Sequence, residues 1–408
     1  MYPYAIFTLF TRQLSAKRIL GPYFAKIMKI IINGHSLKPP LTGIGHYTQC
    51  LLQGLQHNTR IRELVCIPKI NNDDENLDKK NYWPTKINSF IRSLPGTYAA
   101  LNRFRNINFK KKVASFSEKN FIYHEPSYIL RPYSGLKICT VHDLSHIHYP
   151  QYHPRERVKF LLKHLAISIE HAQHIITGSH FVRREIIDFF KLPANKITTV
   201  YHGVAKIFRP RTENDLRPVL ARYQLLGKKY LLYIGTLEPR KNIERLIQAF
   251  CRLPPQWRAQ YPLILVGSKG WCSYKLEKLI HQLTQKEQFY YLGYVPEADL
   301  PYLYSGAHAF VYLSLYEGFG LPVLEALASG IPCMTSNVSS IPEVVGEAGL
   351  LVNPWDVDAI TAALSRLLSD PVLRADLKRK GPVQAAKFSW QSCVNNTIDV
   401  YEGILASS

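Results

Sequence analysis

The segment Tyr316–Gly330, YEGFGLPVLEALASG, gives the strongest indication of how this chain folds. It follows an apolar run, Ala309–Leu315, of the kind that forms a buried strand. Gly318 and Gly320 leave bare amides in the turn after that strand. Pro322 suits the first turn of a helix, so a helix is predicted to begin at this turn. The positive end of such a helix favours an anionic ligand.

Two glutamates accompany the glycine turn. Glu317 lies on the loop and Glu325 about one turn inside the predicted helix, so the two carboxylates can face one cleft from different depths. Carboxylates accept hydrogen bonds without donating any, which suits the hydroxyls of a ribose or a hexose. The pattern therefore predicts a site for a sugar nucleotide.

The residues from Glu317 to Pro332 read E-G-F-G-L-P-x-x-E-A-x-A-x-G-x-P. This motif resembles the signature of the retaining family-four glycosyltransferases with the GT-B fold. The resemblance implies an α/β chain of two Rossmann-like domains whose parallel sheets face a central cleft, with the acceptor on the first domain and the nucleotide sugar on the second. It assigns Glu325 to the ribose hydroxyls and Glu317 to the sugar hydroxyls. It also implies donor contacts from Gly318, Phe319, Gly320 and Leu321.

A second glycine turn begins at Gly235, after the continuously apolar strand predicted at 229–234, and delivers Arg240 and Lys241 side by side at a helix start. The Arg guanidinium can donate hydrogen bonds to two phosphate oxygens at once, and Lys adds a positive charge. Arg240 and Lys241 are therefore predicted to bind a diphosphate and are called the diphosphate clamp. The segment also matches the family pattern G-x-x-x-x-R-K-N. Arg240 and Lys241 are expected to stabilise the leaving diphosphate, and no metal or other cofactor is expected.

Three motifs of the first half resemble the same family. Gly43 and Gly45 lie in T-G-I-G-x-Y, after a strand-like run, and this motif resembles the N-terminal motif of bacterial mannosyltransferases that build surface polysaccharide. By this resemblance Gly43, Gly45, Ser179 and Gly235 are expected to contact the donor. His142 follows the strand predicted at 137–141, in a V-H-D-L match to the acceptor-domain motif, and is expected to contact the sugar or the acceptor. Ser179 is predicted to cap a helix and line the cleft. The family commonly has Asn in place of His202, so a donor contact there stays open.

The domain boundaries follow from composition and from the alternation of strands and helices. Residues 28–204 are predicted to form the acceptor domain, 205–228 the linker and 229–388 the donor domain. The final helix, within 389–408, is expected to cross back to the first domain. Residues 1–27 are either a basic arm that lies on a membrane or an upstream start; the second is preferred because a Rossmann-type strand follows Met28 directly.

Charge is unevenly distributed along the chain. Of the net +21, residues 1–200 contribute 29 Lys and Arg against 12 Asp and Glu, whereas 201–408 contribute 22 against 18. This asymmetry suggests an anionic partner for the first half, either a membrane leaflet or nucleic acid, and a merely basic surface is the plain alternative. The segment 86–119 interleaves basic and aromatic residues and is predicted to form a helical surface able to rest on anionic headgroups.

Cysteine usage and hydropathy bear on location. The seven cysteines form no C-x-x-C pair, which favours reduced thiols in the cytoplasm. No window offers the ~20 apolar residues that span a bilayer. The expected location is therefore the cytoplasm, peripheral on the inner face of the cytoplasmic membrane. The oligomeric state is not indicated.

The resemblance implies transfer of a hexose with retention to a glycan or to a polyprenyl- or lipid-linked acceptor in lipopolysaccharide (O-antigen) synthesis. Its T-G-I-G-x-Y part points to GDP-mannose; UDP-glucose, a UDP-N-acetyl sugar and a dTDP- or GDP-deoxysugar are the alternatives. A glycoside hydrolase with two carboxylates would leave the Arg-Lys-Asn clamp unexplained. A non-catalytic nucleic-acid-binding protein would need a recognition module, and the sequence shows none.

Overall fold

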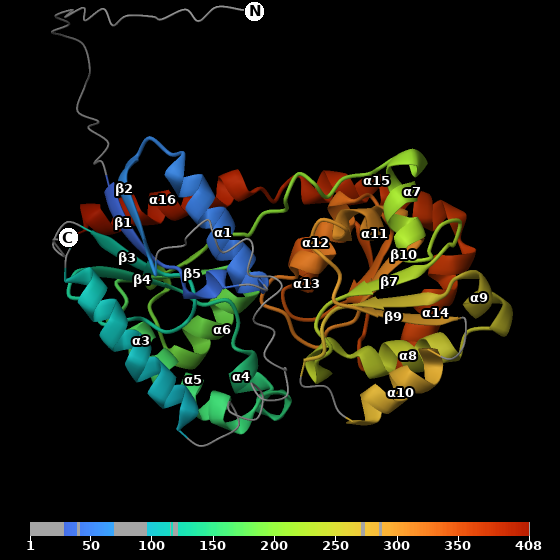
Figure 1. The fold of residues 1–408 in the computed structure, drawn as a ribbon, viewed down its shortest axis with the longest axis horizontal. Helices are drawn as coiled ribbons and strands as arrows, with labels where there is room; N and C mark the ends of the chain where they lie inside the picture. The colour runs from blue at the N-terminus through green and yellow to red at the C-terminus, as the bar shows by residue number, and fades with distance from the viewer. Residues whose placement is uncertain are drawn as a thin grey trace, which may run out of the picture.

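The computed structural model describes residues 28–38, 41–68, 96–114, 116, 121–270, 274–284 and 288–407. The described chain forms two α/β domains that lie side by side, each with one six-stranded parallel sheet (Figure 1). The predicted GT-B architecture of two Rossmann-like domains is confirmed. The expectations for residues 1–27 and for residues 86–95, 115 and 117–119 of the basic segment 86–119 fall outside the described residues.

The first domain has the strand order β2-β1-β3-β4-β5-β6. Its strands are β1 (Met28–Asn33), β2 (Ile61–Ile67), β3 (Ile122–Glu125), β4 (Leu136–Thr140), β5 (His174–Thr177) and β6 (Ile197–Thr199). Its helices are α1 (Gly43–Gln56), α3 (Thr97–Val113), α4 (Ser145–His148), α5 (Arg155–His171) and α6 (His180–Phe190), with short 3-10 turns at His35–Leu37, Pro150–Tyr152 and Ala194–Lys196.

The second domain has the strand order β12-β11-β10-β7-β8-β9. Its strands are β7 (Leu231–Ile234), β8 (Leu263–Val266), β9 (Phe289–Gly293), β10 (Ala309–Tyr312), β11 (Cys333–Ser336) and β12 (Gly349–Val352). Its helices are α7 (Glu213–Arg222), α8 (Ile243–Cys251), α9 (Pro255–Gln260), α10 (Tyr274–Thr284), α11 (Leu300–Gly306), α12 (Leu321–Ala328), α13 (Ile341–Val345), α14 (Val357–Ser369) and α15 (Pro371–Ala385), with a 3-10 turn at Pro239–Lys241.

Burial explains why these segments form parallel sheets. All four residues of β7, β8 and β10 are buried, as expected of strands covered by helices on both faces. The apolar side chains of the second domain form one core cluster, and those of the first domain form three separate clusters. Because each domain has its own core, the cleft between them can change without unfolding either domain.

Two chain segments connect the domains and lie next to each other. Val204 lies where the chain leaves the first domain, and Ser389 lies where the chain returns to it. The two residues form a parallel bridge. The last helix, α16 (Trp390–Ala406), then packs against α1 of the first domain (Figure 1). The segment 205–228 is not purely a linker, because it contains α7, which packs on α11 of the second domain. Within the described ranges, no helix is both long enough and apolar enough to span a bilayer.

Candidate active site

The glycine turn after β10 is built as the sequence predicts. Gly320 adopts a φ of +107°, a conformation that side-chain-bearing residues rarely reach, and Pro322 occupies the first turn of α12. Among the described residues, the amides of Gly318, Phe319, Gly320 and Leu321 donate to no protein acceptor. These amides at the start of an eight-residue helix suit an anionic ligand.

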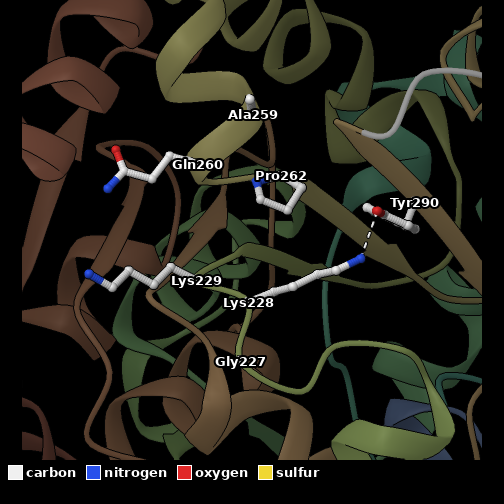
Figure 2. A pocket seen from close by; sticks show the side chains of 7 residues that line it. All are labelled: Gly227, Lys228, Lys229, Ala259, Gln260, Pro262 and Tyr290. Carbon is white, nitrogen blue, oxygen red and sulfur yellow. Dashed lines mark hydrogen bonds between the residues drawn. The ribbon is translucent and has the colours of Figure 1, made fainter.

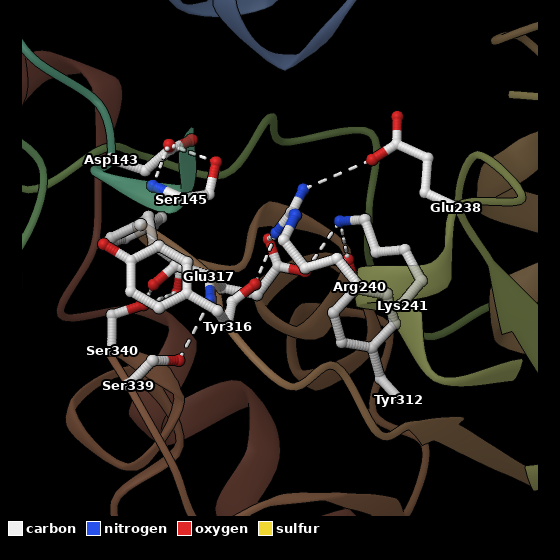
Figure 3. A network of polar contacts seen from close by, with 12 residues as sticks. Asp143, Ser145, Glu238, Arg240, Lys241, Tyr312, Tyr316, Glu317, Ser339 and Ser340 are labelled. Carbon is white, nitrogen blue, oxygen red and sulfur yellow. Dashed lines mark hydrogen bonds and ion pairs between the residues drawn. The ribbon is translucent and has the colours of Figure 1, made fainter. Parts of the chain in front are cut away.

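Arg240 and Lys241 converge on Glu317 from the turn after β7 (Figure 3). The Lys241 Nζ lies 2.6 Å from one carboxylate oxygen and the Arg240 Nη1 3.1 Å from the other. Lys241 also donates to the Tyr312 hydroxyl at 2.6 Å, and Tyr312 donates to Glu317 at 3.0 Å. The side chains of Arg240 and Lys241 are each 12% exposed, so both cations are largely shielded from bulk water.

The charge state of this cluster follows from its contacts. Burial raises the pKa of Glu317, but the Arg240 and Lys241 cations outweigh burial and bring that pKa down to about 2. Burial lowers the pKa of Lys241, and its neighbour Arg240 lowers it further, against the attraction of Glu317. Glu317 is therefore a carboxylate at neutral pH, and it lies within ion-pair distance of both Arg240 and Lys241.

Glu325 lies on α12, eight residues after Glu317. Its carboxylate accepts a hydrogen bond from the Tyr304 hydroxyl at 2.9 Å. Burial raises the pKa of Glu325 to about 7, the hydrogen bond from Tyr304 works against that rise, and the charge of Glu297 adds to it. Glu297 is thus close to Glu325, and it also pairs with His46 of the first domain at 3.1 Å.

The first domain places His142 just beyond the carboxyl end of β4, as predicted. The ring is buried, and its Nε2–H donates to the Pro126 carbonyl at 2.7 Å. Burial lowers the pKa of His142, so the ring is neutral and its Nδ1 is an acceptor. The next residue, Asp143, accepts two hydrogen bonds from Ser145, at 2.9 and 2.7 Å. Burial raises the pKa of Asp143, but the charge of Arg240 and these bonds lower it below its usual range.

Ser179 caps α6, as predicted, by accepting from the Val182 amide at 3.2 Å. Its hydroxyl donates across the cleft to the Gly318 carbonyl at 2.8 Å. Gly318 packs so closely on the first domain that a Cβ there would lie 1.9 Å from the His142 carbonyl oxygen. The close approach of the two domains therefore accounts for this glycine, in addition to its bare amide.

The remaining predicted donor residues lie in different surroundings. Gly43 is exposed in the first turn of α1, where an added Cβ would lie 4.0 Å from Leu321. Gly45 instead packs within the first domain, since a Cβ there would lie 2.8 Å from the Ser36 carbonyl oxygen. At Gly235 an added Cβ would lie 2.9 Å from the Tyr233 hydroxyl. The Phe319 ring is buried against His202, Phe388 and Tyr201, beside the two interdomain segments. Packing thus explains Gly45, Gly235 and the Phe319 ring, and their donor contacts stay predictions.

Five residues of the site were not singled out from the sequence. Most of their contacts with the site join distant segments of the chain: Asp143, Glu297, Tyr304, Tyr316 and Glu343. Asp143 and Tyr316 also stand inside the quoted V-H-D-L motif and the stretch Tyr316–Gly330, next to His142 and Glu317.

A hollow in the second domain lies away from this site. It is lined by residues that precede β7 and β8 and by Tyr290 of β9, so it opens at the amino ends of the strands (Figure 2). Within the described part of the chain, no three His, Cys, Asp or Glu side chains gather as a metal site requires. Asp356 and Asp358 have D-x-D spacing, but Asp356 caps α14 and Asp358 pairs with Arg252.

Comparison with known proteins agrees with this geometry. The family model described as "Glycosyl transferases group 1" matches residues 221–384, and "Glycosyltransferase Family 4" matches residues 120–206. The O-antigen chain mannosyltransferase B of Escherichia coli is 41% identical over 92% of this chain and 100% of its own length. The O-antigen chain mannosyltransferase RfbU of Salmonella typhimurium is 30% identical over 58% of this chain and 62% of its own.

Two solved structures share the fold. Sucrose-phosphate synthase from Thermosynechococcus elongatus has a TM-score of 0.69 at 20% identity and covers 93% of this chain and 100% of its own. Anabaena HepE, solved with UDP-glucose, has a TM-score of 0.68 at 15% identity, with coverage of 92% and 100%. The matched regions include both halves of the site, namely Asp143 on one domain and the Arg240, Lys241 and Glu317 cluster on the other. This chain therefore belongs to the group 1 and family 4 glycosyltransferases of GT-B fold and is a glycosyltransferase.

Proposed function

We propose that this enzyme transfers mannose from GDP-mannose, with retention of the anomeric configuration, to a lipid-linked glycan in O-antigen synthesis. The observation that carries the proposal is the paired cation site at the donor loop, Leu313–Gly320 between β10 and α12, where Arg240 and Lys241 meet Glu317. The mannosyl part is supported by the 41% identity, over nearly the whole chain, to an O-antigen chain mannosyltransferase.

The chemistry assigned to the cluster is charge stabilisation. Cleaving the bond between sugar and phosphate develops negative charge on the diphosphate. Arg240, Lys241 and the amides of Gly318–Leu321 are proposed to stabilise that charge. When a diphosphate binds, both cations gain a second anionic partner. The Glu317 oxygens can then accept hydrogen bonds from sugar hydroxyls. We propose that these groups suffice without a metal. Transfer that survives treatment with EDTA is the expected result, and loss of transfer that a divalent cation restores would contradict it.

The preference for GDP is proposed to come from Glu297. This carboxylate lies beside Glu325, the residue assigned to the ribose, in the segment between β9 and α11. A guanine offers its N1–H and its N2 amino group on one edge, and a carboxylate accepts from both, whereas uracil offers a single N–H. Glu297 therefore suits a guanine base next to the ribose.

Binding measurements can test the donor. Calorimetry with GDP, UDP, GDP-mannose and UDP-glucose is expected to show the tightest binding for the two GDP ligands. Glu297→Gln is expected to weaken GDP by about 1–3 kcal/mol, the usual cost of losing a two-point contact to a base. The matched control is Glu213→Gln on the exposed face of α7. Tighter binding of UDP than of GDP, or unchanged GDP binding in the Glu297 variant, would contradict the assignment.

A membrane-facing surface is proposed on α3. Leu101, Phe104 and Ile107 are 43%, 64% and 48% exposed, which is unusual for three apolar side chains on one helix of a globular domain. Arg103, Lys110 and Lys111 are exposed on the same helix, and Thr97–Val113 contains no Asp or Glu. Exposed apolar groups among cations are typical of helices that lie in the interface of an anionic membrane. The enzyme is thus proposed to work peripherally on the cytoplasmic membrane, where a lipid-linked acceptor resides.

Cosedimentation with liposomes can test this surface. The chain is expected to bind vesicles that contain anionic lipid and to detach in high salt, since each basic residue contributes ~1 kcal/mol within a Debye length. The variant Lys110→Glu with Lys111→Glu is expected to lose binding. Arg217→Glu with Lys378→Glu changes the net charge equally at exposed positions of α7 and α15 and is expected to retain it. Equal binding by both variants, or no binding by the wild type at low salt, would contradict the membrane proposal.

A further inference from the structure

Tyr316 directly precedes Glu317 in the donor loop, yet its ring is buried in the other domain. The side chain is 2% exposed and lies against His148, Tyr149 and Phe181, at ring-centroid distances of 6.0, 5.6 and 5.9 Å. All three partners belong to the first domain. A large side chain of the donor loop is thus packed against the acceptor domain.

The Tyr316 hydroxyl makes two hydrogen bonds to the first domain. It accepts from the Leu144 amide at 3.0 Å and donates to the Glu185 carboxylate at 2.5 Å. Leu144 directly follows His142 and Asp143, so this contact joins the acceptor-domain loop to the donor loop. The main-chain carbonyl of Tyr316 accepts from Arg240 of the diphosphate clamp (Figure 3). One residue therefore contacts the parts of the site that come from both domains.

Glu343 makes a second set of contacts between the two domains. Glu343, at the start of α13, accepts from the amides of His180 and Phe181 at 2.8 and 3.2 Å and from the Tyr201 hydroxyl at 2.6 Å. These amides are the first of α6, so a carboxylate of one domain caps a helix of the other.

The residues just before Glu343 complete the connection. Ser339 accepts from the Glu317 amide at 3.0 Å, and Ser340 donates to the Glu317 carbonyl at 2.8 Å (Figure 3). The backbone of Glu317 is therefore fixed between the contacts of Tyr316 on one side and those of Glu343 and its neighbours on the other.

We propose that Tyr316 and Glu343 are positioning residues that form an interdomain latch: their contacts close the cleft and, in the same step, place Glu317 for the sugar. The inference rests on the glycosyl transfer proposed above and assigns it two further residues. Because each domain has its own core, the latch changes how closely the two domains approach each other and leaves the folding of each domain unchanged.

Steady-state kinetics and solution scattering together test the latch. Tyr316→Phe removes only the hydroxyl and keeps the ring, and it is expected to lower kcat about tenfold or more while the KM for the donor and the Tm stay near the wild-type values. Glu343→Gln keeps one acceptor oxygen for the α6 amides and is expected to retain more activity than Glu343→Ala. The matched control, Tyr290→Phe at the distant hollow, removes a hydroxyl bonded to Lys228 and is expected to change nothing in kcat.

Scattering from the ligand-free protein does not depend on the donor. The radius of gyration of Tyr316→Phe and of Glu343→Ala is expected to exceed that of the wild type and of Tyr290→Phe. If Tyr316→Phe keeps the wild-type kcat and the wild-type radius, the latch is refuted. If the wild type transfers nothing from GDP-mannose, the donor assignment fails instead, and scattering alone decides on the latch.

Discussion

Removing the charge of Lys241 tests the diphosphate clamp most selectively. Lys241→Met keeps most of the side-chain volume and deletes a cation that lies 2.6 Å from Glu317 on a side chain only 12% exposed. A unit charge ~4 Å away through an effective dielectric of ~20 interacts by ~4 kcal/mol, which corresponds to ~10³ in rate. Only the charge that grows in the transition state counts toward turnover, so the expected loss in kcat/KM is ~10²–10³.

The assay is acceptor-dependent release of the nucleoside diphosphate, with thermal unfolding measured in parallel. The fold should tolerate the change, because Arg240 stays paired with Glu317 at 3.1 Å. Lys228→Met, at the hollow lined by Tyr290 (Figure 2), removes an equivalent charge far from the cleft and should leave turnover unchanged. A kcat/KM within about threefold of the wild type would refute the clamp, and so would a loss of activity fully explained by unfolding.

Three further outcomes follow from the described contacts. Gly318→Ala places a Cβ 1.9 Å from the His142 carbonyl, so it should hold the domains apart and lower kcat by ~10² or more at nearly unchanged Tm; wild-type kinetics would show that the domains need not approach so closely. Burial raises the pKa of Glu125 to about 7, so the native state binds an extra proton between pH ~4.5 and 7, and the free energy of unfolding should fall as pH rises through that window. Denaturant titrations of Glu125→Gln should show a flatter dependence, and an equal slope would exclude Glu125 as its source. Tyr401→Phe leaves the Nδ1 of buried His124 without its partner at 2.6 Å and should cost about 1–3 kcal/mol, with faster hydrogen exchange in α16; unchanged exchange would show that this bond does not hold the helix.

Much of the fold could be predicted because its signals are local. A buried apolar run followed by Gly318, Gly320 and Pro322 dictates a strand, a turn and a helix within a few residues. Ser179 caps α6 for the same kind of reason, since the acceptor side chain and the donor amide lie three residues apart. The charges of Arg240 and Lys241 could likewise be placed at the carboxyl end of β7 from sequence order alone.

The contacts between the domains could not be predicted, because they join residues far apart in the chain. Nothing near Tyr316 in sequence shows that its hydroxyl meets Glu185, 131 residues earlier. Gly318 illustrates the same limit, since its sequence context indicates a bare amide for phosphate, whereas the structure adds the close approach of His142. The sequence therefore indicates which groups act on the donor, and the structure is needed to show what brings them together.

Transfer with a defined donor and acceptor tests the central proposal most directly. The wild-type chain is incubated with GDP-mannose and a lipid-linked glycan, GDP release is followed, and the anomeric configuration of the product is read by NMR. GDP release is expected to depend on the acceptor, and the product is expected to keep the α configuration of the donor. A product of inverted configuration, or transfer from another sugar nucleotide but none from GDP-mannose, would contradict it.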